Sequence, residues 1–212
     1  MNVEQIYIAT RRQLRGVAES LIAGPQYRMA GTIRLAVRPS GFAGTAIALA
    51  VQGRELVWPN GAAPLAGPLG AVAEAAGVLP GPPGDVYDAV DALPPDTVLD
   101  IDDGSADVLY RSIYAGGHAL KRVLPESHPV LWPEHFDVAV ADNEVNYGVS
   151  PGDDFHPTPY AYVGPWATVQ GAFWNAPFGA VAALDPAHDV DTLTERIAEF
   201  FERGRAELRG RP

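Results

Sequence analysis

Glycine and proline constrain the fold of this chain more than any other feature of its sequence. The 212 residues include 22 glycines and 20 prolines, which cluster at 59–70, 77–84, 94–95 and 148–165. Because neither residue suits the interior of a helix or a strand, these clusters predict loops between short elements. Hydrophobic residues make up 47% of the chain and continue between the clusters, so the loops belong to a folded chain. This length predicts a single domain, residues 1–212.

Four stretches between the loops have the apolar spacing of helices. Gly24 and Pro25 are expected to end the first stretch. Gly116 and Gly117 predict either a break or tight packing in the third. The C-terminal stretch has the clearest pattern, with apolar residues on one face and Arg and Glu on the other. The four stretches are residues 3–22, 65–76, 106–124 and 190–208.

Alternation of apolar and polar residues predicts two antiparallel meanders. The first covers about 29–58, with its first strand over 29–37 and a turn at Gln52–Gly53. The second covers about 134–166. The sequence therefore predicts an α+β fold. An antiparallel sheet, or a pair of meanders, is flanked by an N-terminal and a C-terminal helix, and helices from 65–124 cover one side.

The charge distribution argues against nucleic acid and membranes as partners. The net charge is −11, and no Lys or Arg occurs in the 73 residues between Arg122 and Arg196. Nucleic-acid binding needs clustered Lys and Arg to neutralise phosphates. A membrane-spanning helix needs a run of about 18 apolar residues, and the sequence has none. The first residues do not form a secretory signal pattern, so a cytoplasmic location is expected.

Residues 131–178 carry ten of the 19 aromatic residues and most of the candidate chemistry. With a two-residue turn at Asp142–Asn143, strands over 136–141 and 144–149 would form a hairpin. One face would be apolar and belong to the core. The other would collect polar side chains, with small residues between them that leave room for a ligand. These polar residues are His135, Asp137, Glu144 and Asn146, separated by Ala139, Ala141 and Gly148.

The polar face of this hairpin allows two interpretations. It can be the solvated outer face of an antiparallel sheet, which is common. It can also be a binding site, to which the proline-restricted loop over 150–159 would add Asp153 and His156. In that loop, the alternative is a turn whose Asp side chains bond to their own backbone.

The first functional hypothesis is a small-molecule-binding protein or enzyme with an acidic, aromatic-walled pocket. Because the segment has no Lys or Arg, the pocket would favour a neutral or cationic ligand. In an enzyme, His135 oriented by Asp137 would be the acid–base pair, since residues i and i+2 of a strand share a face. The sequence leaves open whether the protein is an enzyme and names no cofactor. The ligand-binding residues would be Trp132, Glu144, Asn146, Tyr147, Asp153, His156, Tyr160, Tyr162 and Trp166.

Two alternatives belong to other functional classes. His135, Asp137 and Glu144 would be the ligands of a metal site, and such mixed nitrogen and oxygen ligands suit zinc, manganese or iron. Thiolate sites are excluded because the chain has no cysteine. In a non-catalytic interaction protein, an exposed apolar patch for a homodimer would be formed by Trp166, Phe173 and Trp174 with Pro165 and Pro177.

Three strings in the second half of the chain resemble a known group of proteins. They read LWPEHFD over 131–137, NYGVSPGD over 146–153 and YVGPW over 162–166. They resemble a family of conserved actinobacterial proteins to which no activity is assigned, and the likeness extends over nearly the whole chain. The resemblance implies no substrate, cofactor or partner. It places the distinctive residues in 131–179, as the residue patterns do.

Overall fold

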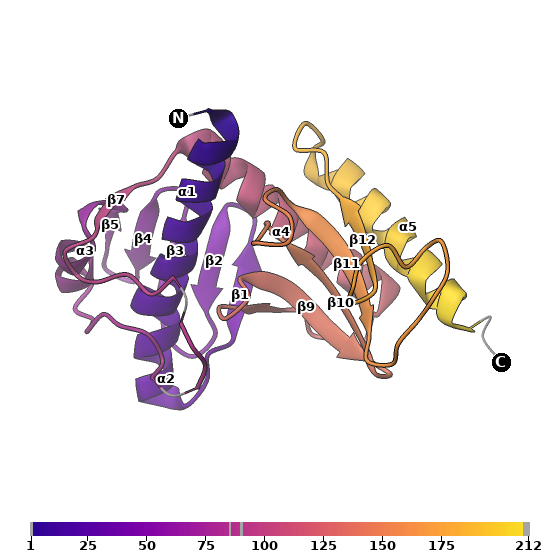
Figure 1. Ribbon diagram of the computed structural model, residues 1–212. Coiled ribbons are helices and arrows are strands. Elements are labelled where there is room, and N and C mark those ends of the chain that lie inside the picture. Colours follow the sequence, from indigo (N-terminus) through magenta and orange to yellow (C-terminus); the bar gives the residue numbers. More distant parts are fainter. Residues whose placement is uncertain (1, 85, 90, 210–212) are drawn as a thin grey trace. The chain divides into compact units, whose positions relative to one another are not determined.

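The computed structural model describes residues 2–84, 86–89 and 91–209, which form two compact units. Unit 1 contains the chain up to Tyr110 together with Leu131–Phe136, and unit 2 contains Arg111–Val130 and the chain from Asp137 onward. Each unit combines helices with antiparallel strands (Figure 1). The predicted α+β class, with a helix at each end of the chain, is confirmed. The single domain stays a prediction.

Unit 1 begins with a longer helical segment than the sequence predicts. Helix α1 (Val3–Val17) continues through a π-helical turn, η1 (Ala18–Ala23), into α2 (Gly24–Ala30). The expected stop at Gly24–Pro25 is wrong, because proline is tolerated in the first turn of a helix. Gly31, with φ +68°, ends α2. A strand over 29–37 is therefore also wrong in its first half.

The strands of unit 1 form an antiparallel sheet in the order β8-β1-β2-β3-β4-β5. The range predicted for the first meander, 29–58, contains four strands, and β5 continues the meander beyond it. The β3–β4 turn lies at Gly53–Arg54, one residue later than predicted. Its core includes Phe42, whose ring contacts Phe136 and Tyr110. The strands are β1 (Leu35–Arg38), β2 (Gly41–Gly44), β3 (Ala50–Gln52), β4 (Glu55–Trp58), β5 (Gly61–Pro64) and β8 (Val130–Trp132).

A smaller two-stranded sheet completes unit 1. Strand β6 (Ala66–Pro68) pairs with β7 (Val98–Asp100). Helix α3 (Leu69–Ala75) follows β6 directly and occupies only the later part of the predicted 65–76 helix. Pro68 and the strand pairing before it delay the start of that helix.

Unit 2 packs two helices on one face of a four-stranded antiparallel sheet. Its order is β12-β11-β10-β9. A Cβ at Gly116 of α4 would lie 2.7 Å from Val149, and one at Gly204 of α5 would lie 2.9 Å from Val163. Helix α4 runs unbroken through Gly116, so tight packing is the alternative that the structure confirms. The elements are α4 (Asp103–Val123), which begins in unit 1, β9 (Asp137–Asp142), β10 (Val145–Ser150), β11 (Tyr160–Pro165), β12 (Ala180–Ala183) and α5 (Val190–Arg209).

The β9–β10 hairpin keeps its predicted faces although its turn is shifted. Asp142 pairs with Val145, so the turn residues are Asn143 and Glu144, with φ +48° and +62°. Both left-handed values are those of a type I′ turn. Moving the turn by one residue changes each opposing partner by two positions, so every strand residue stays on its predicted face. Glu144 is the exception, because it now lies in the turn.

Candidate functional site

The polar face predicted for the hairpin lies on the side of the unit 2 sheet opposite to α4 and α5. On this face the Tyr162 hydroxyl of β11 donates a hydrogen bond to the Asp137 carboxylate of β9. Gly148 of β10 lies between them, and a Cβ there would be 2.4 Å from Tyr162 Oη. Glycine at this position therefore lets the tyrosine reach across a strand. Asp137 is only 6% exposed.

A second tyrosine–carboxylate pair joins the adjacent loop to the same face. Tyr160 Oη donates to Asp153 Oδ2 over 2.5 Å. Asp153 Oδ1 accepts the backbone N–H groups of Phe155 and His156 at 2.9 and 3.0 Å, so this carboxylate also organises the loop. The predicted alternative for the loop, Asp side chains bonded to their own backbone, is thus present.

The two phenols of this face remain protonated donors at neutral pH. Burial raises the pKa of Tyr162, and the neighbouring Asp137 raises it further. Burial also raises the pKa of Tyr160, with the hydrogen bond to Asp153 acting in the same direction. Both effects disfavour the phenolate.

Aromatic rings surround these pairs. His156 lies 5.7 Å from Tyr160 between ring centroids, and the Tyr160 and Tyr162 rings are 6.3 Å apart. Phe155 contacts Tyr160, Phe178 contacts Tyr162, and both phenylalanines remain exposed, at 47% and 41%. We call Asp137, Asp153, His156, Tyr160 and Tyr162 the tyrosine–aspartate cluster. All five were predicted site residues.

Four other predicted residues of unit 2 lie outside this cluster. Asn146 Oδ1 accepts a hydrogen bond from Trp166 Nε1 at 3.2 Å, and Trp166 is 66% exposed. Glu144 occupies the hairpin turn. Tyr147 lies on the helix-covered face, where its ring packs 5.8 Å from that of Phe201. Tyr147 is therefore part of the core.

The two remaining predicted residues belong to unit 1. The Trp132 ring lies 5.8 Å from the Arg34 guanidinium carbon, within the range of a cation–π contact. His135 follows β8 in a turn, and its side chain is 73% exposed. The carboxylate beside it is that of Glu134, 3.6 Å from His135 Nε2.

The metal-binding arrangement is not formed by the part of the chain that the structure describes. Within residues 2–84, 86–89 and 91–209, no group of three or more His, Asp or Glu side chains is arranged to hold a metal ion. His135, Asp137 and Glu144 are all among these residues.

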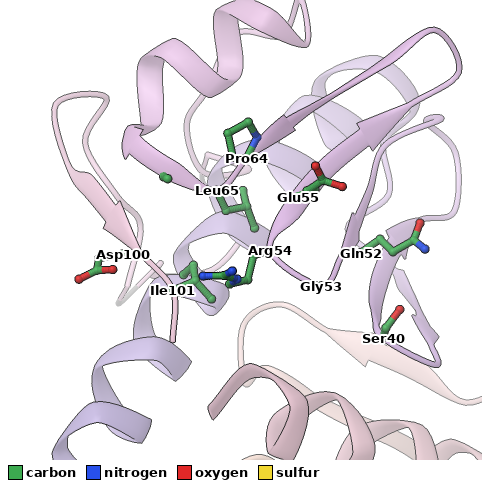
Figure 2. A pocket seen from close by; sticks show the side chains of 10 residues that line it. Ser40, Gln52, Gly53, Arg54, Glu55, Pro64, Leu65, Asp100 and Ile101 are labelled. Carbon is green, nitrogen blue, oxygen red and sulfur yellow. The ribbon is translucent and has the colours of Figure 1, made fainter. Parts of the chain in front are cut away.

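Unit 1 contains a cavity that the sequence did not predict (Figure 2). It has a volume of about 670 Å³ and lies at the β3–β4 turn, beside the β5–β6 passage and the end of β7. Figure 2 shows Arg54 beside Ile101, with Ser40 and Gln52 on the opposite side of the cavity. The lining combines polar or charged side chains with small and apolar ones: Ser40, Gln52, Gly53, Arg54, Glu55, Pro64, Leu65, Ala66, Asp100 and Ile101.

Hydrogen bonds to the backbone hold the walls of this cavity together. Gly53, whose φ of +58° suits the tight turn, donates its N–H to Ser40 O at 2.7 Å. Leu65 N donates to Arg54 O at 2.8 Å, which fixes the β5–β6 passage beside β4. Tyr110 Oη donates to Gly53 O at 2.9 Å. The turn is thus tied to three other segments of unit 1.

Acidic groups outnumber basic ones at this cavity. Arg54 Nε lies 3.5 Å from Asp103 Oδ1, and both side chains are largely exposed. Glu55 and Asp100 add two further carboxylates to the lining. The lining therefore has two carboxylates and one guanidinium, whose charge is offset by Asp103, a balance that disfavours an anionic ligand.

Comparison with protein-family models, curated proteins and solved structures gives no match. The resemblance of the three strings to the actinobacterial family therefore stays a prediction. Among the residues that the structure describes, no helix combines the length and apolarity needed to cross a bilayer.

Proposed function

We propose that this protein binds a small polar organic molecule, neutral or cationic, in the cavity of unit 1. The observation that carries the proposal is the cavity itself. Its volume of about 670 Å³ falls within the roughly 300–1,000 Å³ of ligand pockets. Its walls combine apolar surface with a few fixed polar groups, which is typical of small-molecule sites.

The chemistry of the lining supports a ligand that donates hydrogen bonds. Glu55 and Asp100 offer carboxylate oxygens, and the Arg54 charge is compensated by Asp103. Leu65 and Ile101 add apolar wall. An amine or a polyol would donate to the carboxylates, whereas an organic acid would meet the acidic excess.

Native mass spectrometry of freshly purified, undialysed protein tests the proposal first, because a bound organic molecule appears as a mass adduct. A thermal-shift screen of amines, polyols and organic acids then gives the ligand class. We expect stabilisation by amines or polyols. Glu55→Gln combined with Asp100→Asn should weaken amine binding about tenfold or more, because hydrogen bonds to charged groups contribute about 1.5–3 kcal/mol.

Glu74→Gln is the matched control, since it removes an exposed carboxylate from α3 of the same unit. It should leave binding unchanged. Stabilisation by organic acids alone, or equal amine affinity in the double variant and the wild type, would contradict the proposal.

A second candidate is a ligand site at the tyrosine–aspartate cluster of unit 2. Two carboxylates with two phenol donors, beside the half-exposed rings of Phe155 and Phe178, favour a neutral or cationic ligand there. The acid–base pairing of His135 with Asp137 stays a prediction, because His135 belongs to unit 1 and is not part of the tyrosine–aspartate cluster. NMR shift changes on ligand addition distinguish the two, because they would fall in 137–162 here and in 40–101 for the cavity. The homodimer and the cytoplasmic location stay predictions.

A further inference from the structure

Glu19 is a buried acid that neither proposed site uses. It lies in the π-helical turn η1, and its side chain is fully buried. Neither carboxylate oxygen has a hydrogen-bond partner in the described part of the chain. The Arg15 Nε approaches Oε1 to 3.6 Å, which is longer than a hydrogen bond. Burying a carboxylate in this way is costly, and π-turns occur frequently at functional sites.

Residues 91–95, here called the cover segment, close over this turn. Leu93 N donates to Ser20 Oγ at 3.1 Å. Gly16 allows the close approach, because a Cβ there would lie 2.3 Å from Leu93 Cγ and 2.5 Å from Asp91 O. Asp91 Oδ2 lies 3.4 Å from Arg15 Nη1. Gly70 N also donates to Pro95 O at 2.8 Å. Hydrogen bonds at both ends of the sequence 93–95, an ion pair and close packing therefore hold the cover segment.

The charges around Glu19 do not balance. The Arg15 guanidinium forms ion pairs with both Glu19 and Asp91, and it donates a hydrogen bond to the backbone oxygen of Glu134. The Tyr87 hydroxyl is buried without a hydrogen-bond partner in the described part of the chain. Burial raises the pKa of this phenol, and the charges of Glu19 and Glu134 raise it further. One guanidinium is thus shared by two carboxylates, those of Glu19 and Asp91, and by a backbone carbonyl. Burial raises the pKa of Glu19 from 4.5 to about 7 against the opposing effect of Arg15; the Asp91 carboxylate raises it further, and the Asp91 backbone lowers it.

We infer that Glu19 is a proton-binding site that controls the opening of the cover segment. With a proton, Glu19 is neutral, and Arg15 is left to pair with Asp91 on the cover segment. Without the proton, the Glu19 carboxylate is negatively charged, shielded from water and close to the Asp91 carboxylate. Opening then lets water reach Glu19 and moves Asp91 away, exposing a polar site of Glu19, Arg15 and Ser20.

Linkage gives the direction and size of the effect. The closed state binds the proton more tightly, so closure is favoured at low pH and is lost as the pH rises through about 7. If the opened Glu19 has its ordinary pKa, the equilibrium constant for opening rises about tenfold between pH 6 and pH 8.

Hydrogen exchange followed by mass spectrometry tests this inference. After correction for the intrinsic pH dependence of exchange, protection of the cover segment, including the Leu93 amide, should fall about tenfold from pH 6 to pH 8. Glu19→Gln is neutral at both pH values and should remove this change. Glu4→Gln, which neutralises an exposed carboxylate at the start of the same helix, should retain it.

A second measurement keeps the inference testable if Glu19→Gln does not fold. The side-chain carboxyl carbon of Glu19 in the wild type should titrate by NMR with a midpoint near 7, and Asp91→Asn should lower that midpoint. Unchanged protection between the two pH values, or a midpoint near 4.5, would overturn the inference. So would an equal loss of protection at Phe42 and Val51, because unfolding of the whole unit would then explain it.

Discussion

The hydrogen bond from Tyr162 to Asp137 gives the sharpest prediction for unit 2. Tyr162→Phe removes one hydroxyl and keeps the ring that contacts Phe178. Asp137 is 6% exposed, so water cannot readily replace the lost donor. A hydrogen bond to a charged group contributes about 1.5–3 kcal/mol, and we expect the free energy of unfolding to fall by that amount.

Urea denaturation followed by circular dichroism measures this loss, and a double-mutant cycle with Asp137→Ala isolates the pair. The coupling free energy between the two positions should be about 1.5 kcal/mol or more, because each single variant already removes the same hydrogen bond. Tyr114→Phe, at a partly exposed position of the same unit, is the control and should cost little. A coupling below about 0.5 kcal/mol would refute the reasoning, since that is the scatter expected of independent sites.

Three further variants test other contacts. Gly148→Ala places a Cβ 2.4 Å from Tyr162 Oη, so it should cost about 1–3 kcal/mol in urea denaturation, and a neutral effect would contradict the described path of Tyr162. Gly116→Ala should destabilise the protein in the same assay despite its gain in helix propensity, because its Cβ would lie 2.7 Å from Val149; stabilisation would mean that α4 packs less closely than described. The pKa of Glu19 is about 7 when folded and 4.5 as its ordinary value, so the stability it contributes is present at low pH and is lost as the pH rises. From pH 5 to pH 8 the wild type should lose about 2.5 kcal/mol relative to Glu19→Gln, and parallel pH profiles would refute this.

The faces of the β9–β10 hairpin were predictable from the sequence, but its turn was not. Alternation has a period of two, so a shift of the turn by one residue leaves the faces intact. Both Asp142–Asn143 and Asn143–Glu144 contain an asparagine that tolerates left-handed backbone. The structure uses the second pair although Glu144, at φ +62°, is a poor residue for it. Pairing along the strands outweighs the local preference.

The length of the N-terminal helix was predicted incorrectly for a similar reason. Gly24 and Pro25 are ordinary signals for a helix end. Here a Cβ at Gly24 would lie 1.8 Å from Gly81 O, so the glycine serves a contact with a distant segment. Local sequence does not contain that information. The unit 1 cavity was missed for the same reason, because its lining comes from several short segments that the fold alone brings together.

The sequence pointed to the chemistry of Asp137 but not to that of Glu19. Asp137 belongs to a strand of alternating polar and apolar residues, so the face of the sheet on which it lies can be deduced from the sequence. Glu19, in contrast, lies in a helix, close to the residue at which that helix was expected to end. The two buried carboxylates differ in their partners. Asp137 accepts a hydrogen bond from the Tyr162 hydroxyl, whereas the Arg15 guanidinium, 3.6 Å from Glu19, is shared with Asp91. Proton uptake is therefore expected at Glu19, and an acceptor role in structure or recognition at Asp137.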